Sequence, residues 1–205
     1  MPNWCCTSVV IYANEKEAFP QLLELYEKLH RAIQPPGRIP NSFGEKWLGN
    51  IVDAFGYKPG SDILCRGEIT IEPECPTEDK LFIRYDAEEA WAPDHVELWE
   101  NVLSSQYPDL MMTYCAEECG SGIYINTDKS GRFFPDRYRL DISEFSIDDE
   151  IVYDDPYFSS SVSLFKYATN LFRKPIKSFD DLYDAIFIAE RNNQGSISFH
   201  QFEYA

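Results

Sequence analysis

Strand-like and helical patterns of apolar residues alternate along the first two thirds of the chain. Residues 4–12 (WCCTSVVIY) are rich in β-branched and aromatic side chains, which is typical of a strand. Apolar side chains then recur at helical spacing, at Leu22, Leu25, Tyr26, Leu29 and Ile33. Asn14 followed by Glu17 predicts a capping box at the start of this helix, and Pro35-Pro36-Gly37 ends it.

The next hundred residues repeat this alternation. A long connection at 37–61 is expected to contain a short helix near 46–55. Strands are predicted at 63–71 and 80–85, and the prolines between them favour a hairpin. Pro93 predicts the first position of a second helix, because proline is tolerated there, and a fourth strand is predicted at 110–116.

The resulting order, β-α-β-β-α-β, predicts an α+β fold of the ferredoxin-like, split β-α-β type. In this fold an antiparallel sheet carries two helices on one face. Short strands at 123–125 and 138–142, joined by a hairpin turn at 126–131, are expected to extend the same sheet. The sequence therefore predicts a ferredoxin-like domain at 1–145.

The rest of the chain, 146–205, is expected to be an acidic linker followed by a C-terminal helical segment. One helical pattern begins at Val162, and a second begins after Ser178, which is a good N-cap residue. A last strand is predicted at 196–202. These helices are too apolar to stand in water, so we expect the segment to pack on the first domain.

The charge of the chain is strongly negative and uneven. The formal net charge is −17, and ten acidic residues but no Lys or Arg lie between Asp86 and Asp128. A second acidic cluster lies at 148–155, whereas five basic residues balance five acidic ones from Ser159 onward. A surface of this sign repels phosphates at long range, which argues against direct nucleic-acid binding.

The composition is that of a globular cytoplasmic protein. No apolar run approaches the roughly 20 residues of a membrane span, and the first residues lack the pattern of a signal peptide. Without an export signal the six cysteines are expected to be free thiols. No contact with a membrane is predicted.

Motifs for catalysis or cofactor binding are absent from the sequence. It contains no G-x-S-x-G, P-loop, H-E-x-x-H or G-x-G-x-x-G pattern and no C-x-x-C pair. His30 and His95 are expected on helices in contact with solvent, and no histidine has a partner at ligand or triad spacing. The sequence therefore predicts no metal, no cofactor and no catalytic residue.

Four short stretches resemble one known family. These are Asn3-Trp4-Cys5, Gly44-Glu45-Lys46-Trp47, Ala90-Trp91-Ala92-Pro93, and Tyr114 through Gly120 with Glu117 inside it. Together they make residues 1–142 similar to the YubB ferredoxin-like family, whose members are carried by plasmids, phages and other mobile elements. The resemblance implies the fold and the setting, and it implies neither an iron–sulfur cluster nor a known activity. Thr7, Phe43 and Leu48 depart from the usual family pattern.

The sharpest candidate site combines carboxylates with tryptophans. Glu88, Glu89, Glu117 and Glu118 could supply a carboxylate pair for acid–base or metal chemistry, and Trp47 and Trp91 could line a cleft beside them. The alternative, that the tryptophans fill the core and the glutamates face water, is favoured.

These observations favour a non-catalytic acidic accessory or interaction protein of a plasmid, phage or conjugative element, with an unidentified protein partner. Three alternatives stay open. The chain could be a DNA-mimic inhibitor of a host DNA-binding protein, because its acidic residues are concentrated. It could be a metal-dependent enzyme that uses Glu117 and Glu118. Its acidity could also serve only solubility.

Overall fold

The computed structural model describes residues 3–147, 150–192 and 194–203. It is an α+β structure with antiparallel sheets, and it divides into two compact units at the junction of Thr127 and Asp128. Each unit has a hydrophobic core of its own. The two units are therefore described separately.

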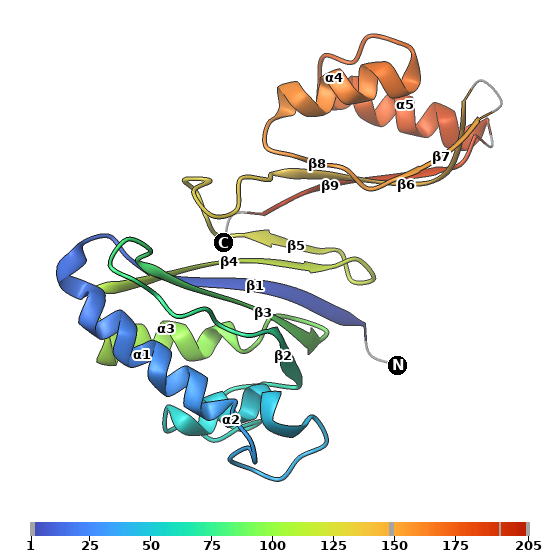
Figure 1. Ribbon diagram of the computed structural model, residues 1–205. Helices are drawn as coiled ribbons and strands as arrows, with labels where there is room; N and C mark the ends of the chain where they lie inside the picture. Colours follow the sequence, from blue (N-terminus) through green and yellow to red (C-terminus); the bar gives the residue numbers. More distant parts are fainter. Residues whose placement is uncertain (1–2, 148–149, 193, 204–205) are drawn as a thin grey trace. The chain divides into compact units, whose positions relative to one another are not determined.

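The first unit is built on a five-stranded sheet. Its elements follow the chain order β1 (Trp4–Ala13), α1 (Phe19–Ala32), α2 (Leu48–Ala54), β2 (Gly67–Ile71), β3 (Phe82–Ala90), α3 (Val96–Gln106), β4 (Leu110–Glu118) and β5 (Ile123–Asn126). The strands are antiparallel and lie in the order β2-β3-β1-β4-β5. Figure 1 shows α1 and α3 on the same side of this sheet.

Alternation along the strands decides which side chains enter the core of the first unit. In β1 the side chains of Cys5, Val9 and Ile11 face the helices and are fully buried. Cys6 lies on the other face and is exposed. Successive side chains of a strand point to opposite faces, so this alternation also governs where the glutamates of β3 and β4 lie.

The second unit has a smaller sheet with two helices on one face (Figure 1). Its elements are β6 (Tyr138–Ile147), β7 (Glu150–Asp154), β8 (Tyr157–Phe158), α4 (Ser161–Phe172), α5 (Phe179–Arg191) and β9 (Ser196–Gln201). The strand β6 is central, because it pairs with β7, β8 and β9. Leu140, Leu164 and Leu182 are fully buried in the core between the sheet and the helices.

The predicted domain boundary at 145/146 differs from the structural boundary at 127/128. Residues 138–142 were expected to extend the first sheet, but they belong to β6 of the second sheet. The expected acidic linker at 146–160 contains β7 and β8, because its Ile151-Val152-Tyr153 and Tyr157-Phe158 runs favour strands over linker. Asp148 and Asp149 of the predicted acidic cluster lie outside the described residues.

The segment 126–131 connects the two sheets and is not the expected hairpin turn within one sheet. The Asp128 carboxylate accepts hydrogen bonds from the backbone N–H groups of Ser130, Gly131, Phe133 and Phe134. Its side chain therefore organises the loop that precedes β6.

Helix ends agree with the sequence in one case and differ in two. The hydroxyl of Ser178 accepts a hydrogen bond from the Asp181 N–H, which confirms it as the N-cap of α5. Asn14 does not cap α1, because a 3-10 turn at Lys16–Ala18 comes first and the helix begins at Phe19. Pro93 is not in the first helical position, because α3 begins at Val96. None of the helices among the described residues has the length and apolar character needed to span a membrane.

Candidate functional site

The four candidate glutamates do not form one site, because neighbours on a strand point to opposite faces. Glu88 and Glu117 flank Cys6 on the sheet face away from the helices, one from β3 and one from β4. Two strand spacings of about 4.8 Å put their backbones about 10 Å apart. Glu89 and Glu118 are buried instead.

Glu118 serves a turn. Its carboxylate accepts hydrogen bonds from the backbone N–H groups of Gly120 and Ser121. Hydrogen bonds from Ser121, from the Gly120 backbone and from the Asn3 side chain lower the pKa of Glu118, against the opposing effect of burial. A carboxylate engaged in this way stabilises the turn after β4.

Glu89 belongs to a buried chain of hydrogen-bonded polar groups on the face of the sheet that the helices cover. Its carboxylate accepts a hydrogen bond from the His95 N–H and contacts the ring nitrogen Nδ1 of His95. The other ring nitrogen, Nε2, lies 2.8 Å from the Tyr85 hydroxyl, which also accepts a hydrogen bond from the indole N–H of Trp99. His95 is only 2% exposed, so the prediction that it faces solvent is wrong.

The described residues offer no metal centre in place of these carboxylates. They contain no group of three or more His, Cys, Asp or Glu side chains that could hold a metal ion.

Burial first, and then the charges of Glu88 and Glu117, raise the pKa of Cys6, so this exposed thiol is a poor nucleophile at neutral pH.

The ten acidic residues of 86–128 are divided among different environments. Three are buried, namely Glu89, Glu118 and Asp128. Glu97 and Glu100 lie on the exposed side of α3, whereas Asp86, Glu88 and Glu117 lie on the opposite face of the sheet. Within the first unit the acidic residues placed here are thus divided between both faces of the sheet and the core, and they do not form one strip of the kind that DNA mimicry requires.

The two tryptophans of the candidate site do line one cavity in the first unit. It has a volume of about 480 Å³. Its lining comes from three segments and consists of Asn41, Ser42, Phe43, Trp47, Pro59, Gly60, Leu64, Cys65, Arg66, Ala90, Trp91 and Asp94. None of the four glutamates is part of it. A largely apolar cavity of this size with a few polar groups is the usual form of a binding pocket.

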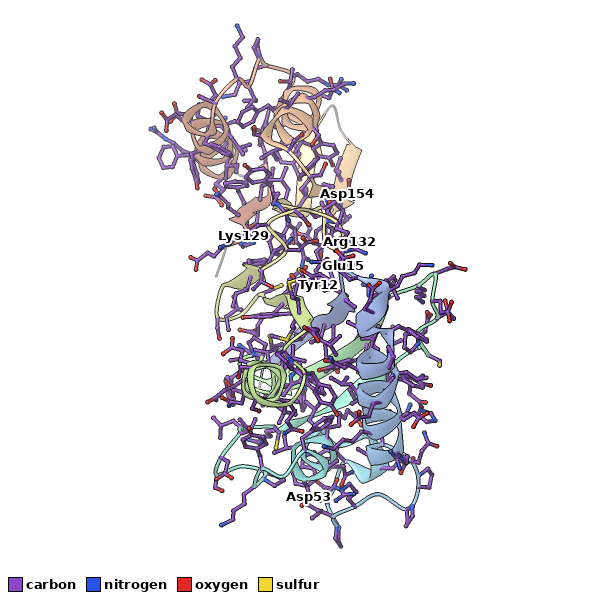
Figure 2. The ribbon with its side chains drawn as sticks, turned by 90° about the vertical axis from the view of Figure 1, so that its left-hand side faces the viewer. Tyr12, Glu15, Asp53, Lys129, Arg132 and Asp154 are labelled. Atoms are coloured by element: carbon purple, nitrogen blue, oxygen red, sulfur yellow. The ribbon has the colours of Figure 1, made fainter. Side chains whose placement is uncertain are left out.

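The first wall, 41–47, is held in place by the buried side chain of Asn50 in α2. Its amide oxygen accepts hydrogen bonds from the N–H groups of Arg38 and Ile39, and its amide nitrogen donates to the carbonyls of Gly44 and Glu45. Arg38 also forms an ion pair of 2.8 Å with Asp53, which is labelled on α2 in Figure 2. These contacts fix the loop that presents Phe43 and Trp47.

Trp47 is wedged between this loop and the second wall, 59–66. Its indole N–H donates to the Cys65 carbonyl at 3.0 Å. A Cβ at Gly49 would lie only 2.4 Å from the six-membered ring of Trp47, so the ring packs directly on the backbone of that glycine. One face and the N–H of the indole are thus occupied, and the remaining ring surface contributes to the cavity.

The third wall, 90–94, joins the other two. The Ala90 N–H donates to the Arg66 carbonyl, and the Trp91 N–H donates to the Asn3 carbonyl, each at 2.9 Å. Trp91 has a φ of +81° and its side chain is 51% exposed. A positive φ in a non-glycine residue costs stability, and such residues tend to cluster at functional sites.

The described side chains that line the cavity include no strong nucleophile. Burial raises the pKa of the Cys65 thiol to about 11, so it is protonated at neutral pH. Among the described residues, no histidine contributes to the lining. The arrangement is suited to binding through aromatic surfaces and two charged side chains, Arg66 and Asp94.

Sequence reasoning identified Trp47 and Trp91 as possible partners but missed Leu64, Arg66 and Asp94. An exposed leucine at the start of a strand-like run is a weak signal, and nothing in the sequence links 64–66 to 91–94. The hydrogen bond between Ala90 and Arg66 that joins them depends on the pairing of β2 with β3.

Several residues of the four motif stretches converge near this cavity. Asn3 contacts both Trp91 and Glu118, and a Cβ at Gly120 would lie 2.2 Å from the Asn3 side chain. No family model matches the chain, and no characterised protein or solved structure is similar enough to it to assign a family.

Proposed function

We propose that this chain is a non-catalytic, acidic interaction protein that binds a protein partner through the Trp47–Trp91 cavity. The single observation that carries the proposal is the cavity itself, an aromatic pocket that lacks a nucleophile paired with a base. Tryptophans in well-packed pockets are the side chains that contribute most binding energy at protein interfaces.

The fold and the setting belong to the same proposal. The element order β-α-β-β-α-β, the strand order β2-β3-β1-β4 and the two helices on one face support a ferredoxin-like first unit. This topology is what membership of the YubB ferredoxin-like family would require, and with it a role as an accessory protein of a mobile element. All six cysteines are free in the structure, which is compatible with a reducing, cytoplasmic compartment.

The negative charge supports a basic or mixed-charge partner. With a net charge of −17 the chain attracts positively charged surfaces and repels phosphate backbones at long range. The charge therefore steers association, while the cavity supplies the specific contact.

Capture from a lysate of the native host tests the proposal when it is done as a comparison. The tagged full chain, Trp91→Ala and Phe187→Ala are used as bait in parallel, and the bound proteins are quantified by mass spectrometry. Phe187 is an exposed aromatic residue of α5 that is not part of the cavity. Loss of a central tryptophan typically costs about 2 kcal/mol or more, which is roughly thirtyfold in affinity. We expect a partner that is retained by Phe187→Ala and lost by Trp91→Ala, and identical capture by all three baits would contradict the proposal.

A further inference from the structure

The charges inside the cavity indicate which chemical group enters it. Three aromatic residues, Phe43, Trp47 and Trp91, line the cavity together with Asp94, which carries a carboxylate. Within the described ranges this carboxylate has no hydrogen-bond or ion-pair partner. The cavity thus combines aromatic residues with a carboxylate that is not engaged in an ion pair.

The surroundings of Asp94 disfavour its negative charge when the cavity is empty. Burial, followed by repulsion from Glu89, raises the pKa of Asp94, and His95 offsets this in part. A cation bound nearby would relieve this repulsion. Aromatic faces add to the attraction, because the negative face of a π system binds alkylammonium groups.

We infer that the occupant of the cavity is the alkylammonium group of a lysine side chain on a basic protein partner, bound best in its N-methylated forms. The inference rests on the proposed function and specifies the group that the cavity recognises. Methylation spreads the positive charge over apolar methyl groups, which suits a pocket lined by indole and phenyl rings. The net charge of −17 attracts basic segments to the chain as a whole.

Arg66 is the cation of the lining, and within the described residues no ion pair joins it to Asp94. Arg66 therefore does not neutralise the carboxylate, and it weakly repels a cationic occupant. Its removal should tighten binding, which is the opposite of what an anionic occupant would show.

The first experiment compares two probes of the same shape on the full-length protein. One is a capped Gly-Lys-Gly peptide with a trimethylated lysine, and the other is its isostere with carbon in place of the charged nitrogen. Titration calorimetry and the indole N–H signals of an NMR spectrum measure affinity and location. We expect the cationic peptide to bind about tenfold more tightly, which is roughly 1.4 kcal/mol.

Variants then separate the charge effect from the apolar one. Asp94→Asn should weaken binding of the cationic peptide several-fold and leave the neutral isostere unaffected, whereas Arg66→Gln should strengthen binding of the cationic peptide. Glu27→Gln, at an exposed position of α1, removes the same charge elsewhere and should change nothing. The comparison of the two peptides is made on the unaltered protein, so it remains valid even if a variant fails to fold.

The outcomes distinguish this inference from the proposed function. Equal binding of the two peptides overturns the inference but leaves an apolar partner group possible. Choline carries the same head group on a small molecule, and choline binding as tight as that of the peptide would overturn a lysine side chain as the source. If neither peptide binds while Trp91→Ala still abolishes capture, the inference fails alone. If Trp91→Ala changes nothing, the proposed function fails.

Discussion

At the scale of single residues, Trp91 gives the strongest support for the proposal that the cavity is a functional feature. Its backbone lies in the left-handed region that favours glycine, and its ring remains half exposed. A residue that costs stability and buries little of its side chain is hard to explain by packing. Contacts of its backbone with Asn3, and of Ala90 with Arg66, hold it in this conformation.

The strain at Trp91 predicts that two variants differ in stability but not in binding. Glycine adopts a positive φ without the steric cost of about 1–2 kcal/mol that other residues incur. Trp91→Gly should therefore be more stable than Trp91→Ala, by about 1 kcal/mol in the free energy of unfolding measured by urea denaturation. Both variants should lose capture of the partner equally. A Trp91→Gly protein that is less stable than Trp91→Ala would contradict the assigned strain.

Residue identity alone could not locate the site, although the alternation of strands could have excluded part of the first hypothesis. Glu88 and Glu89 are neighbours in one strand, so their side chains had to diverge. The role of His95 could not be predicted, because its partners Glu89 and Tyr85 come from β3 while it precedes α3.

At the scale of elements, the sequence predicts what local patterns encode and fails where long-range pairing decides. The strands β1 and β4, the helices α1 and α3 and the N-cap Ser178 were all visible in periodicity and residue type. The assignment of β6 to a second sheet was not visible, because Tyr138–Ser143 pairs with β9 about sixty residues later. The 41–47 segment of the cavity was expected only as part of a long connection. The hydrogen bonds of the buried Asn50 side chain, which help to fix its conformation, were not predictable from local patterns.

Asn50 gives a prediction at this scale. Asn50→Ala leaves the N–H groups of Arg38 and Ile39 and the carbonyls of Gly44 and Glu45 without the partner they have now. Buried groups left unpaired cost about 1–3 kcal/mol each, so the loop should open before the unit unfolds. Hydrogen exchange at Arg38 and Ile39 should accelerate at least tenfold, and capture should weaken.

The matched control is Asn101→Ala, which makes the same change at an exposed position of α3. It should leave exchange of the 38–45 segment unchanged. Slow exchange in Asn50→Ala would show that the loop does not depend on this side chain.

At the scale of the whole molecule, two cores divide a chain whose pattern of elements predicted one ferredoxin-like domain with an appendage. Each unit also contains a carboxylate that orders a loop through backbone N–H groups, Glu118 in the first and Asp128 in the second. Many of the other acidic side chains among the described residues lie at exposed positions, where the proposed function assigns them to long-range attraction of a partner.

These two carboxylates predict acid sensitivity of both units. Burial of Asp128 is outweighed by hydrogen bonds from Ser130 and from the backbones of Phe134, Phe133 and Gly131, so its pKa is lowered from 3.8. A lowered pKa in the folded state stabilises the fold above the unfolded value, and this stabilisation is lost as pH falls through the folded value. The free energy of unfolding should therefore decrease below about pH 4.

Denaturation at a series of pH values measures this effect. Asp128→Asn should show a shallower decrease between pH 5 and the acid limit than the unaltered protein, because asparagine has no carboxylate to protonate. Identical pH profiles of the two proteins would mean that the Asp128 loop does not contribute to the acid sensitivity.

The central claim is that the Trp47–Trp91 cavity is the surface through which the chain engages its partner. Hydrogen exchange of the full-length protein, with and without the captured partner, tests it most directly. The account predicts that the partner slows exchange in the three wall segments, 41–47, 59–66 and 90–94. Slowed exchange only on the exposed side of α5, with all three wall segments unchanged, would contradict it.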